Sequence, residues 1–170
     1  MKIAIDNQIF QRQNYGGISK YFTKLEEHLN ALADVEARIF APLHRNQYLV
    51  NSYHPTDFRI RVSPYPNRFQ IGNRLDSISR AVAFRQIASF QPEIIHETFF
   101  SHRIQVDFDC KRVLTVYDMI REIENPNSEK SQAKLNSILK ADAVICISES
   151  TKKIYCVLLQ LIQTKSQQFT

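Results

Sequence analysis

Residues 1–21 read MKIAIDNQIFQRQNYGGISKY and carry the pattern that decides the fold. A short apolar run that closes with an aspartate, at residues 3–6, predicts a buried strand. A polar loop follows, and the glycine pair Gly16-Gly17 opens a segment, residues 18–32, whose apolar side chains recur at helical spacing. This order of strand, loop and helix is the first unit of a parallel sheet that is covered by helices.

The rest of the chain repeats this alternation. The runs at residues 113–117 and 143–147 are nearly continuous apolar, as in strands that are buried on both faces. Residues 58–62 alternate apolar side chains with arginine, which predicts a strand nearer the sheet edge. The predicted strands are 3–6, 35–41, 58–62, 93–96, 113–117 and 143–147, and the predicted helices are 18–32, 74–90 and 131–139. The fold class is therefore α/β, with a mainly parallel sheet flanked by helices.

Composition limits the domain count and the cellular compartment. The chain has 170 residues, 44% apolar and 23% charged, which is enough for one core and leaves little room for two domains. No run approaches the roughly 18 apolar residues that span a bilayer, and the first residues lack the features of a signal peptide. We therefore expect a cytoplasmic protein. The three cysteines fit neither a zinc site nor a CxxC pair, so we expect reduced, mostly buried thiols.

The net charge of +5 comes with a cluster of arginines: Arg59, Arg61, Arg68, Arg74, Arg80 and Arg85. Such a stretch can face phosphates or an anionic membrane surface. A solvated helix face with loop charges explains it equally well. Nucleic acid is not an expected partner, because no aromatic platform accompanies the basic residues.

The glycine pair is the first candidate for chemistry. Glycine lets a backbone approach a ligand closely, and the free N–H groups of a helix start favour an anion such as phosphate. The alternative is an ordinary turn into a helix. The pair is not part of a GxGxxG pattern, which disfavours NAD.

Polar motifs also follow three predicted strands. His96-Glu97-Thr98 would lie at the sheet edge where ligands collect, although a lone histidine is more often structural. Asp118 and Glu122 occupy the matching place after the next strand, where two carboxylates could orient sugar hydroxyls or simply cap a loop. Residues 148–151 have the composition of a helix N-cap.

In this order, the segments IDNQIF, NYGGISKYF, PEIIHETFF, RVLTVYDMIRE and KADAVICISESTKK resemble the N-terminal domain of the family 4 retaining glycosyltransferases. The resemblance covers residues 1–153. It implies a Rossmann-like, acceptor-side domain that is one half of a GT-B architecture, in which two such domains face each other across a cleft. The implied activity is hexosyl transfer from a nucleotide sugar to an acceptor glycan or lipid, with retention of configuration. The nucleotide sugar is a co-substrate, and neither a cofactor nor a metal ion is expected.

The resemblance also assigns residues. It implies that Asp118 is catalytic, and that substrate is bound by Tyr15, Gly16, Gly17, Lys20, His96, Thr98, Tyr117 and Glu122. Tyr117 stands where many family members carry histidine, so no catalytic role of that histidine is transferred. The Tyr-Asp form is similar to that of a bacterial subgroup that makes cell-surface polysaccharide or lipopolysaccharide.

Residues 154–170, IYCVLLQLIQTKSQQFT, carry one charge and depart from the family pattern. A single-base deletion near the codons for Lys152 and Lys153 would turn a family-like sequence into this tail, so we interpret it as an aberrant, frameshifted segment. We expect the C-terminal donor-binding domain to be absent, and the chain alone to be inactive and poorly soluble. Alternatively, the leucines of the tail dock as a terminal helix.

Two other functions stay open. One is a non-catalytic acceptor-binding or interaction module that pairs with a separately encoded donor-binding domain. The other is an unrelated small α/β nucleotide-binding enzyme, against which the missing phosphate-loop fingerprints count. The expected partner is a sugar acceptor, either a glycan or a lipid-linked saccharide. Peripheral contact with the inner face of the membrane is compatible with the arginines.

Overall fold

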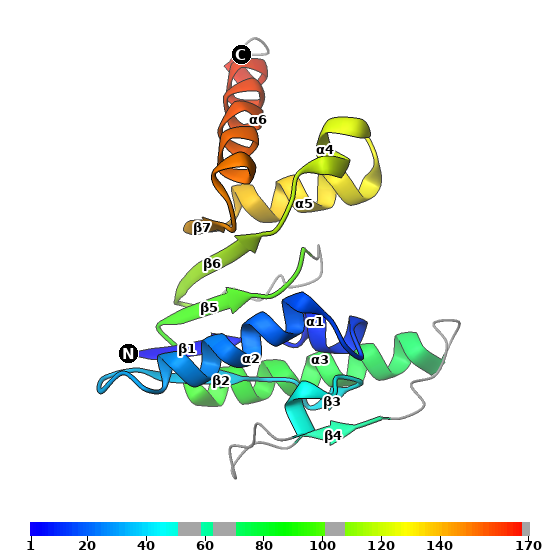
Figure 1. Cartoon of the computed structure of the whole chain (residues 1–170). Coiled ribbons are helices and arrows are strands. Elements are labelled where there is room, and N and C mark those ends of the chain that lie inside the picture. Colours follow the sequence, from blue (N-terminus) through cyan, green and yellow to red (C-terminus); the bar gives the residue numbers. More distant parts are fainter. Residues whose placement is uncertain (51–58, 63–70, 101–107, 168–170) are drawn as a thin grey trace.

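The computed structural model describes residues 1–50, 59–62, 71–100 and 108–167, and its centre is a parallel sheet (Figure 1). The strand order is β2-β1-β5-β6-β7, and every neighbouring pair is parallel. The bounds are β1 Lys2–Ile5, β2 Glu36–Ile39, β5 Ile94–Glu97, β6 Lys111–Val116 and β7 Ala143–Cys146. The predicted α/β class, with a mainly parallel sheet flanked by helices, is confirmed.

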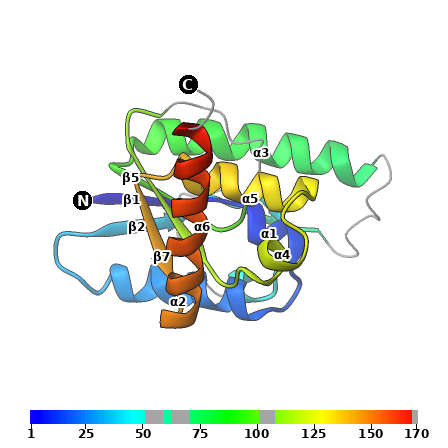
Figure 2. The ribbon, with the colours of Figure 1, turned by 90° about the horizontal axis from the view of Figure 1, so that it is seen from above.

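Helices cover both faces of the sheet (Figure 2). On one face, α2 (Gly17–Leu29) packs Phe22 against Ile5 of β1. On the other face, α3 (Ile71–Phe90) packs Ala83 against Ala4, the neighbour of Ile5. Because successive side chains of a strand point to opposite faces, these two contacts place α2 and α3 on opposite sides. The α5 helix (Glu129–Leu139) joins α3 on its face, over β6 and β7.

The direction of the chain reverses around β1. From β1 it passes through α1 (Gln8–Arg12) and α2 to β2 on one side, whereas β5, β6 and β7 follow on the other side. In open α/β sheets the ligand crevice usually lies at such a reversal, at the carboxyl ends of the strands, and we use the word crevice below for this position at the ends of β1, β5 and β6. The residues that follow these strands are the ones to inspect for function.

Asn30 ends α2 and holds it against β2. Its amide nitrogen donates to the carbonyl oxygen of Ala37 at 2.8 Å, and its amide oxygen accepts from the N–H group of Ala37 at 2.8 Å. Glu26, also in α2, accepts from the N–H group of Ile39 at 2.7 Å. The helix therefore stops at Leu29, three residues before the predicted end at residue 32.

The strand predicted at residues 58–62, nearer the edge of the sheet, is wrong in its place, and residue 58 lies outside the described residues. Within residues 59–62, β4 (Ile60–Arg61) pairs in parallel with β3 (Leu43–His44) in a separate two-stranded sheet. Pro42 precedes β3 and has no N–H group to donate, so the chain leaves the edge of the main sheet after β2. The carbonyl oxygen of Pro42 then accepts from Ile60 at 2.7 Å.

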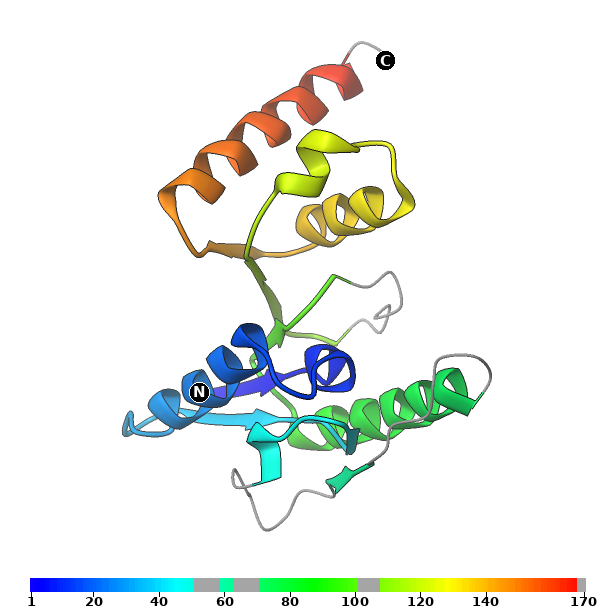
Figure 3. The same cartoon turned by 45° about the vertical axis from the view of Figure 1, so that its right-hand side comes forward.

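The prediction that residues 143–147 are buried on both faces is also wrong. β7 is the edge strand, and Ile145 and Ile147 are 43% and 56% exposed, because α2 covers their face of the sheet only over β1, β2 and β5. The helices α4 (Ile120–Glu124), α5 and α6 (Glu149–Gln167) gather at this end of the sheet (Figure 3). The thiols are not mostly buried either: Cys110 and Cys146 are half-buried and Cys156 is exposed on α6, because they lie at strand ends or on the outer side of a helix.

Several short elements had no sequence signal that we recognised. They are α1, α4, β3 and the 3₁₀ turn η1 (Tyr48–Val50). The tail does form a helix, since α6 extends to Gln167, and the Leu158 side chain packs beside the cluster of Leu114 and Val116. The side chains of residues 159–167 lie outside the described part.

Candidate functional site

A buried hydrogen-bond network closes the carboxyl ends of β1 and β5. Oδ1 of Asp6 accepts from the N–H group of Thr98 at 3.0 Å and from its hydroxyl group, and Oδ2 accepts from the side-chain amide of Gln8 at 2.7 Å. The Thr98 hydroxyl in turn accepts from the N–H group of Ile9 at 3.1 Å. Burial raises the pKa of Asp6. Thr98 is fully buried, so its hydroxyl group joins two loops rather than facing solvent.

His96 forms the floor of the crevice. Its Nε2 atom lies 2.8 Å from the Thr115 hydroxyl, and its ring meets the edge of the Phe22 ring at 5.0 Å between centroids. Burial lowers the pKa of His96 to about 4. The imidazole is therefore neutral at pH 7 and packs between α2 and the sheet.

Glu97 lies on the opposite face and pairs with Arg112. Arg112 donates through Nε at 2.9 Å and through a second nitrogen to the same oxygen of Glu97. Burial, and then the charge of Asp6, raise the pKa of Glu97 to about 7. Its other carboxylate oxygen is buried without a hydrogen-bond partner among the described residues, so the carboxylate is only partly satisfied.

Tyr117 ends β6 and contacts α2. Its ring meets that of Tyr21 edge to face, with centroids 6.3 Å apart. The Tyr117 hydroxyl group is buried without a hydrogen-bond partner among the described residues, and burial raises its pKa. This contact brings the end of β6 beside the second turn of α2, one turn after Gly17.

Lys134, which lies outside the sequence motifs, links the main chain of Asp118 to the side chain of Glu122. The Asp118 side chain is 59% exposed, whereas that of Glu122 is buried. Lys134 of α5 donates to Oε2 of Glu122 at 2.7 Å and to the carbonyl oxygen of Asp118. Glu122 thus forms a buried ion pair with Lys134, and Asp118 is the carboxylate that solvent and ligands can reach.

The glycine pair has two different environments. A Cβ atom on Gly16 would lie 2.2 Å from the side-chain oxygen of Gln13, and that oxygen accepts from the N–H group of Ser19 at 3.1 Å. Gln13 therefore caps the start of α2, where an anion was predicted. Around Gly17 the space is open. Lys20 is exposed, one turn further along the helix.

Tyr15 stands beside this helix start. Its ring is 64% exposed and meets Tyr48 edge to face at 5.8 Å. Ser148 has the expected capping role, because its hydroxyl accepts from the N–H group of Thr151 at 3.1 Å at the start of α6.

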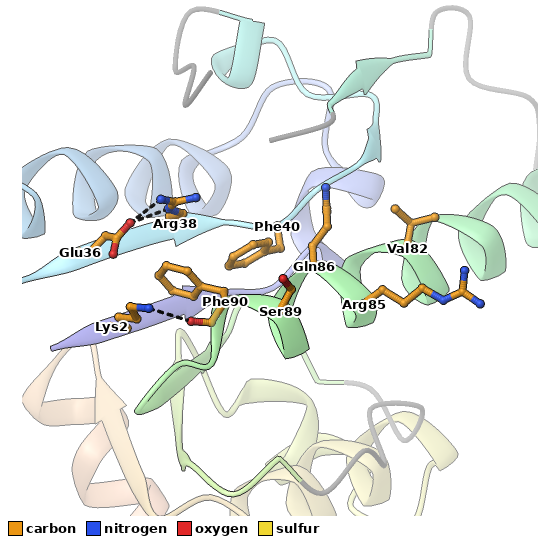
Figure 4. Close-up of a pocket in the computed structure, with 9 residues that line it drawn as sticks. All are labelled: Lys2, Glu36, Arg38, Phe40, Val82, Arg85, Gln86, Ser89 and Phe90. Carbon is orange, nitrogen blue, oxygen red and sulfur yellow. Dashed lines mark hydrogen bonds and ion pairs between the residues drawn. The ribbon is translucent and has the colours of Figure 1, made fainter. Parts of the chain in front are cut away.

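A separate hollow of about 530 Å³ lies at the other side of the molecule, between β2 and α3 (Figure 4). Lys2 and Arg38 lie at one end of the hollow and Arg85 at the other, with Phe40 and Phe90 between them. Lys2 donates to the carbonyl oxygen of Phe90 at 3.3 Å. Of the predicted arginine cluster, Arg68 lies outside the described residues, and Arg59 points inward to the carbonyl oxygen of Ile39 at 2.6 Å.

The described residues contain no group of three or more His, Cys, Asp or Glu side chains that could hold a metal ion. In the same part of the chain, no helix is both long and apolar enough to cross a membrane.

The predicted residues fall into two groups. Tyr15, Gly17, Lys20 and Asp118 are exposed, Tyr117 is half-buried against Tyr21, and His96 and Thr98 are buried. Glu122 and Gly16 face other side chains. Sequence patterns did not indicate Gln13, Tyr21 or Lys134, because each acts through a contact that is distant or irregular in sequence.

A family model described as Glycosyltransferase Family 4 matches residues 15–164. The match includes the glycine pair, the ends of β5, β6 and β7, and part of the segment at residues 154–170, whereas the end of β1 lies before it. No curated protein and no solved structure matches the chain.

Proposed function

The chain belongs to glycosyltransferase family 4, and from that membership we propose that residues 1–153 form the acceptor-side domain of a retaining hexosyltransferase. The donor is a nucleotide sugar, and the acceptor is a glycan or a lipid-linked saccharide. Because of the Tyr117-Asp118 pair, we place the reaction in the synthesis of bacterial cell-surface polysaccharide or lipopolysaccharide.

One observation carries the proposal. An exposed carboxylate, Asp118, follows Tyr117 after the end of β6, and the Tyr117 ring meets the Tyr21 ring of α2. Carboxylates accept hydrogen bonds from sugar hydroxyl groups, and aromatic rings pack against the apolar faces of sugars. The open space at Gly17 lets a ligand approach the first turn of α2, where backbone N–H groups favour phosphate.

We give the residues the following roles. Asp118 is the catalytic residue, and its carboxylate orients the reacting sugar by accepting hydrogen bonds from the sugar hydroxyl groups. Tyr15, Gly17, Lys20 and Tyr117 bind substrate at the rim. His96 and Thr98 shape the floor from below, since the neutral His96 imidazole and the engaged Thr98 hydroxyl have protein partners.

Transfer also needs groups that neutralise a departing nucleoside diphosphate. We propose that a donor-binding domain faces this crevice and supplies them, and that the chain without it is inactive. For residues 154–170 we keep the proposal of a shifted reading frame, although the family match extends to residue 164. The alternative function, a binding module that holds an acceptor for a separately encoded domain, uses the same crevice without Asp118 in a catalytic role.

We further propose a cytoplasmic location with peripheral contact at the inner face of the membrane. Arg74 and Arg85 are exposed along α3, beside Ile78, and could meet anionic headgroups. Cosedimentation with vesicles tests this: binding to vesicles with anionic lipid that salt reverses would support it, and equal binding to purely zwitterionic vesicles would refute it.

The experiment for the main proposal is ¹H–¹⁵N NMR of the chain with a panel of methyl hexosides, disaccharides, UDP-hexoses and GDP-hexoses. We expect at least one saccharide to shift the amide signals of Tyr21, Tyr117 and Asp118. Shifts that fall instead around Arg38 and Arg85, or no shifts with any compound, would refute the proposal.

A further inference from the structure

We propose that Lys134 is a positioning residue of the candidate site, because its buried ammonium group holds the loop that presents Asp118. The inference rests on the proposed function, which gives Asp118 its contact with sugar. It extends that function to a residue in the middle of α5, a helix that the crevice itself does not include.

Lys134 reaches from α5 to the carboxyl end of β6. Its Nζ atom donates to Oε2 of Glu122 at 2.7 Å and to the carbonyl oxygen of Asp118, and it lies 3.8 Å from Oδ1 of Asp118. The same ammonium group lies 4.8 Å from the centroid of the Phe100 ring, just after β5. One cation therefore joins the ends of β5 and β6 to α4, which lies next to α5 (Figures 1 and 3).

Burial explains why these contacts fix the loop. Only 7% of the Lys134 side chain is exposed, and a buried ammonium group is stable only with charged or strongly polar partners. Glu122, which is equally buried, supplies the opposite charge. Because two donors of Lys134 are used by Glu122 and by the backbone of Asp118, the loop has little freedom, while the Asp118 carboxylate stays exposed.

The charges also match a site for neutral sugar. Asp118 and Glu122 are four residues apart, and without a cation between them the two carboxylates would repel each other. With Lys134 the group carries one net negative charge, from two carboxylates and one ammonium group. That charge is located on the exposed Asp118 carboxylate, where hydroxyl groups can donate to it.

The test compares three variants of the full chain. The first is the double variant Lys134→Met with Glu122→Gln, which removes the contacts of the ammonium group. Lys134→Met by itself would leave the Glu122 carboxylate buried without a counter-charge, so the double variant should fold better. Lys134→Arg keeps the cation. Lys130→Met, an exposed lysine of the same helix, is the matched control. Two quantities are measured: amide hydrogen exchange at residues 118–122 relative to β5, and the dissociation constant of the saccharide that binds most tightly in the NMR panel.

We expect the double variant to raise exchange at residues 118–122 by about tenfold over that of β5 and to weaken saccharide binding by about tenfold, the value of one charged hydrogen bond. Lys134→Arg should restore most of both, and Lys130→Met should change neither. Unchanged exchange, or faster exchange with unchanged binding, would overturn the role of Lys134. If the wild-type chain binds no saccharide, the proposed function itself fails, which the wild-type titration alone reveals.

Discussion

The ionisation of Glu97 should make the free energy of unfolding depend on pH. Burial raises its pKa to about 7 in the folded chain, above its ordinary value of 4.5. The unfolded chain therefore loses this proton at lower pH than the folded chain does. The stabilising contribution of protonated Glu97 is complete below about pH 4.5 and is lost as the pH rises through 7.

Glu97→Gln should remove this pH dependence. The amide oxygen of glutamine can still accept from Arg112, so the fold is retained. Urea unfolding at several pH values between 4.5 and 8 measures the effect. We expect the free energy of unfolding of the wild type, relative to the variant, to fall by up to about 3 kcal/mol over this range. Parallel curves for the two proteins would contradict the burial of this carboxyl group.

His96 gives a second prediction at this scale. Its lowered pKa of about 4 means that the imidazole stays neutral at pH 6, while its partner Thr115 remains at hydrogen-bond distance. The contribution of the neutral His96 imidazole to the free energy of unfolding is complete above about pH 6.5 and is lost as the pH falls through 4. Long-range ¹H–¹⁵N spectra of the imidazole between pH 4 and 8 would show this, and protonation near pH 6.5 would contradict it.

Sequence patterns predicted where the polar residues at the strand ends lie, but not which of their side chains are exposed. His96, Thr98 and Asp118 lie at or just after the ends of strands, and from the sequence they look equivalent. Their difference arises from partners elsewhere in the chain: Asp6 and Ile9 engage Thr98, and Lys134 lies behind Asp118. Such contacts depend on the packed structure, which no local pattern encodes.

At the scale of elements, the two glycines at the start of α2 should respond differently to substitution by alanine. Gly16→Ala would push the Gln13 side chain away and break its hydrogen bond to Ser19, which should lower the free energy of unfolding by about 1 kcal/mol. Gly17→Ala is the matched control, because its Cβ atom enters open space and alanine restricts the unfolded chain.

For Gly17→Ala we therefore expect stability that is unchanged or higher by up to about 1 kcal/mol. Thermal and urea unfolding of both variants checks the pair. Equal losses in the two would mean that Gln13 does not cap the helix.

The long elements were predictable because their patterns are long. Residues 18–32 and 74–90 repeat apolar side chains over several turns, and both regions form helices. Several short elements were not predicted: α1 and α4 have five residues each, and β3 has two. In such segments a single proline or a tertiary contact outweighs local preference, as Pro42 does beside β2.

At the scale of the whole molecule, the sheet is unevenly covered. Ile145 and Ile147 are exposed together at the β7 edge, and exposed apolar side chains on an edge strand favour self-association. Ile147→Ser should reduce self-association of the chain in sedimentation velocity without changing its melting temperature by more than a few degrees. Leu32→Ser, which alters a similarly exposed residue in the loop after α2, is the control and should have a smaller effect.

The α/β class follows from the alternation of strands and helices along the chain. The five-stranded order, in contrast, depends on how far each crossover carries the chain, and the separate β3-β4 sheet shows that one predicted strand left the main sheet. The family resemblance places a site at the sheet edge that carries the motifs, and both this position and the roles of its residues stay predictions.

The most direct test of the central claim, that Asp118 contacts sugar, is the dissociation constant of the best saccharide from the NMR panel for Asp118→Asn beside the wild type. Glu124→Gln serves as the control, since it neutralises another exposed carboxylate just beyond the same loop. We predict binding that is weaker by about tenfold in Asp118→Asn, because a charged acceptor is lost, and unchanged in Glu124→Gln. Equal affinities in all three proteins would contradict the proposed function.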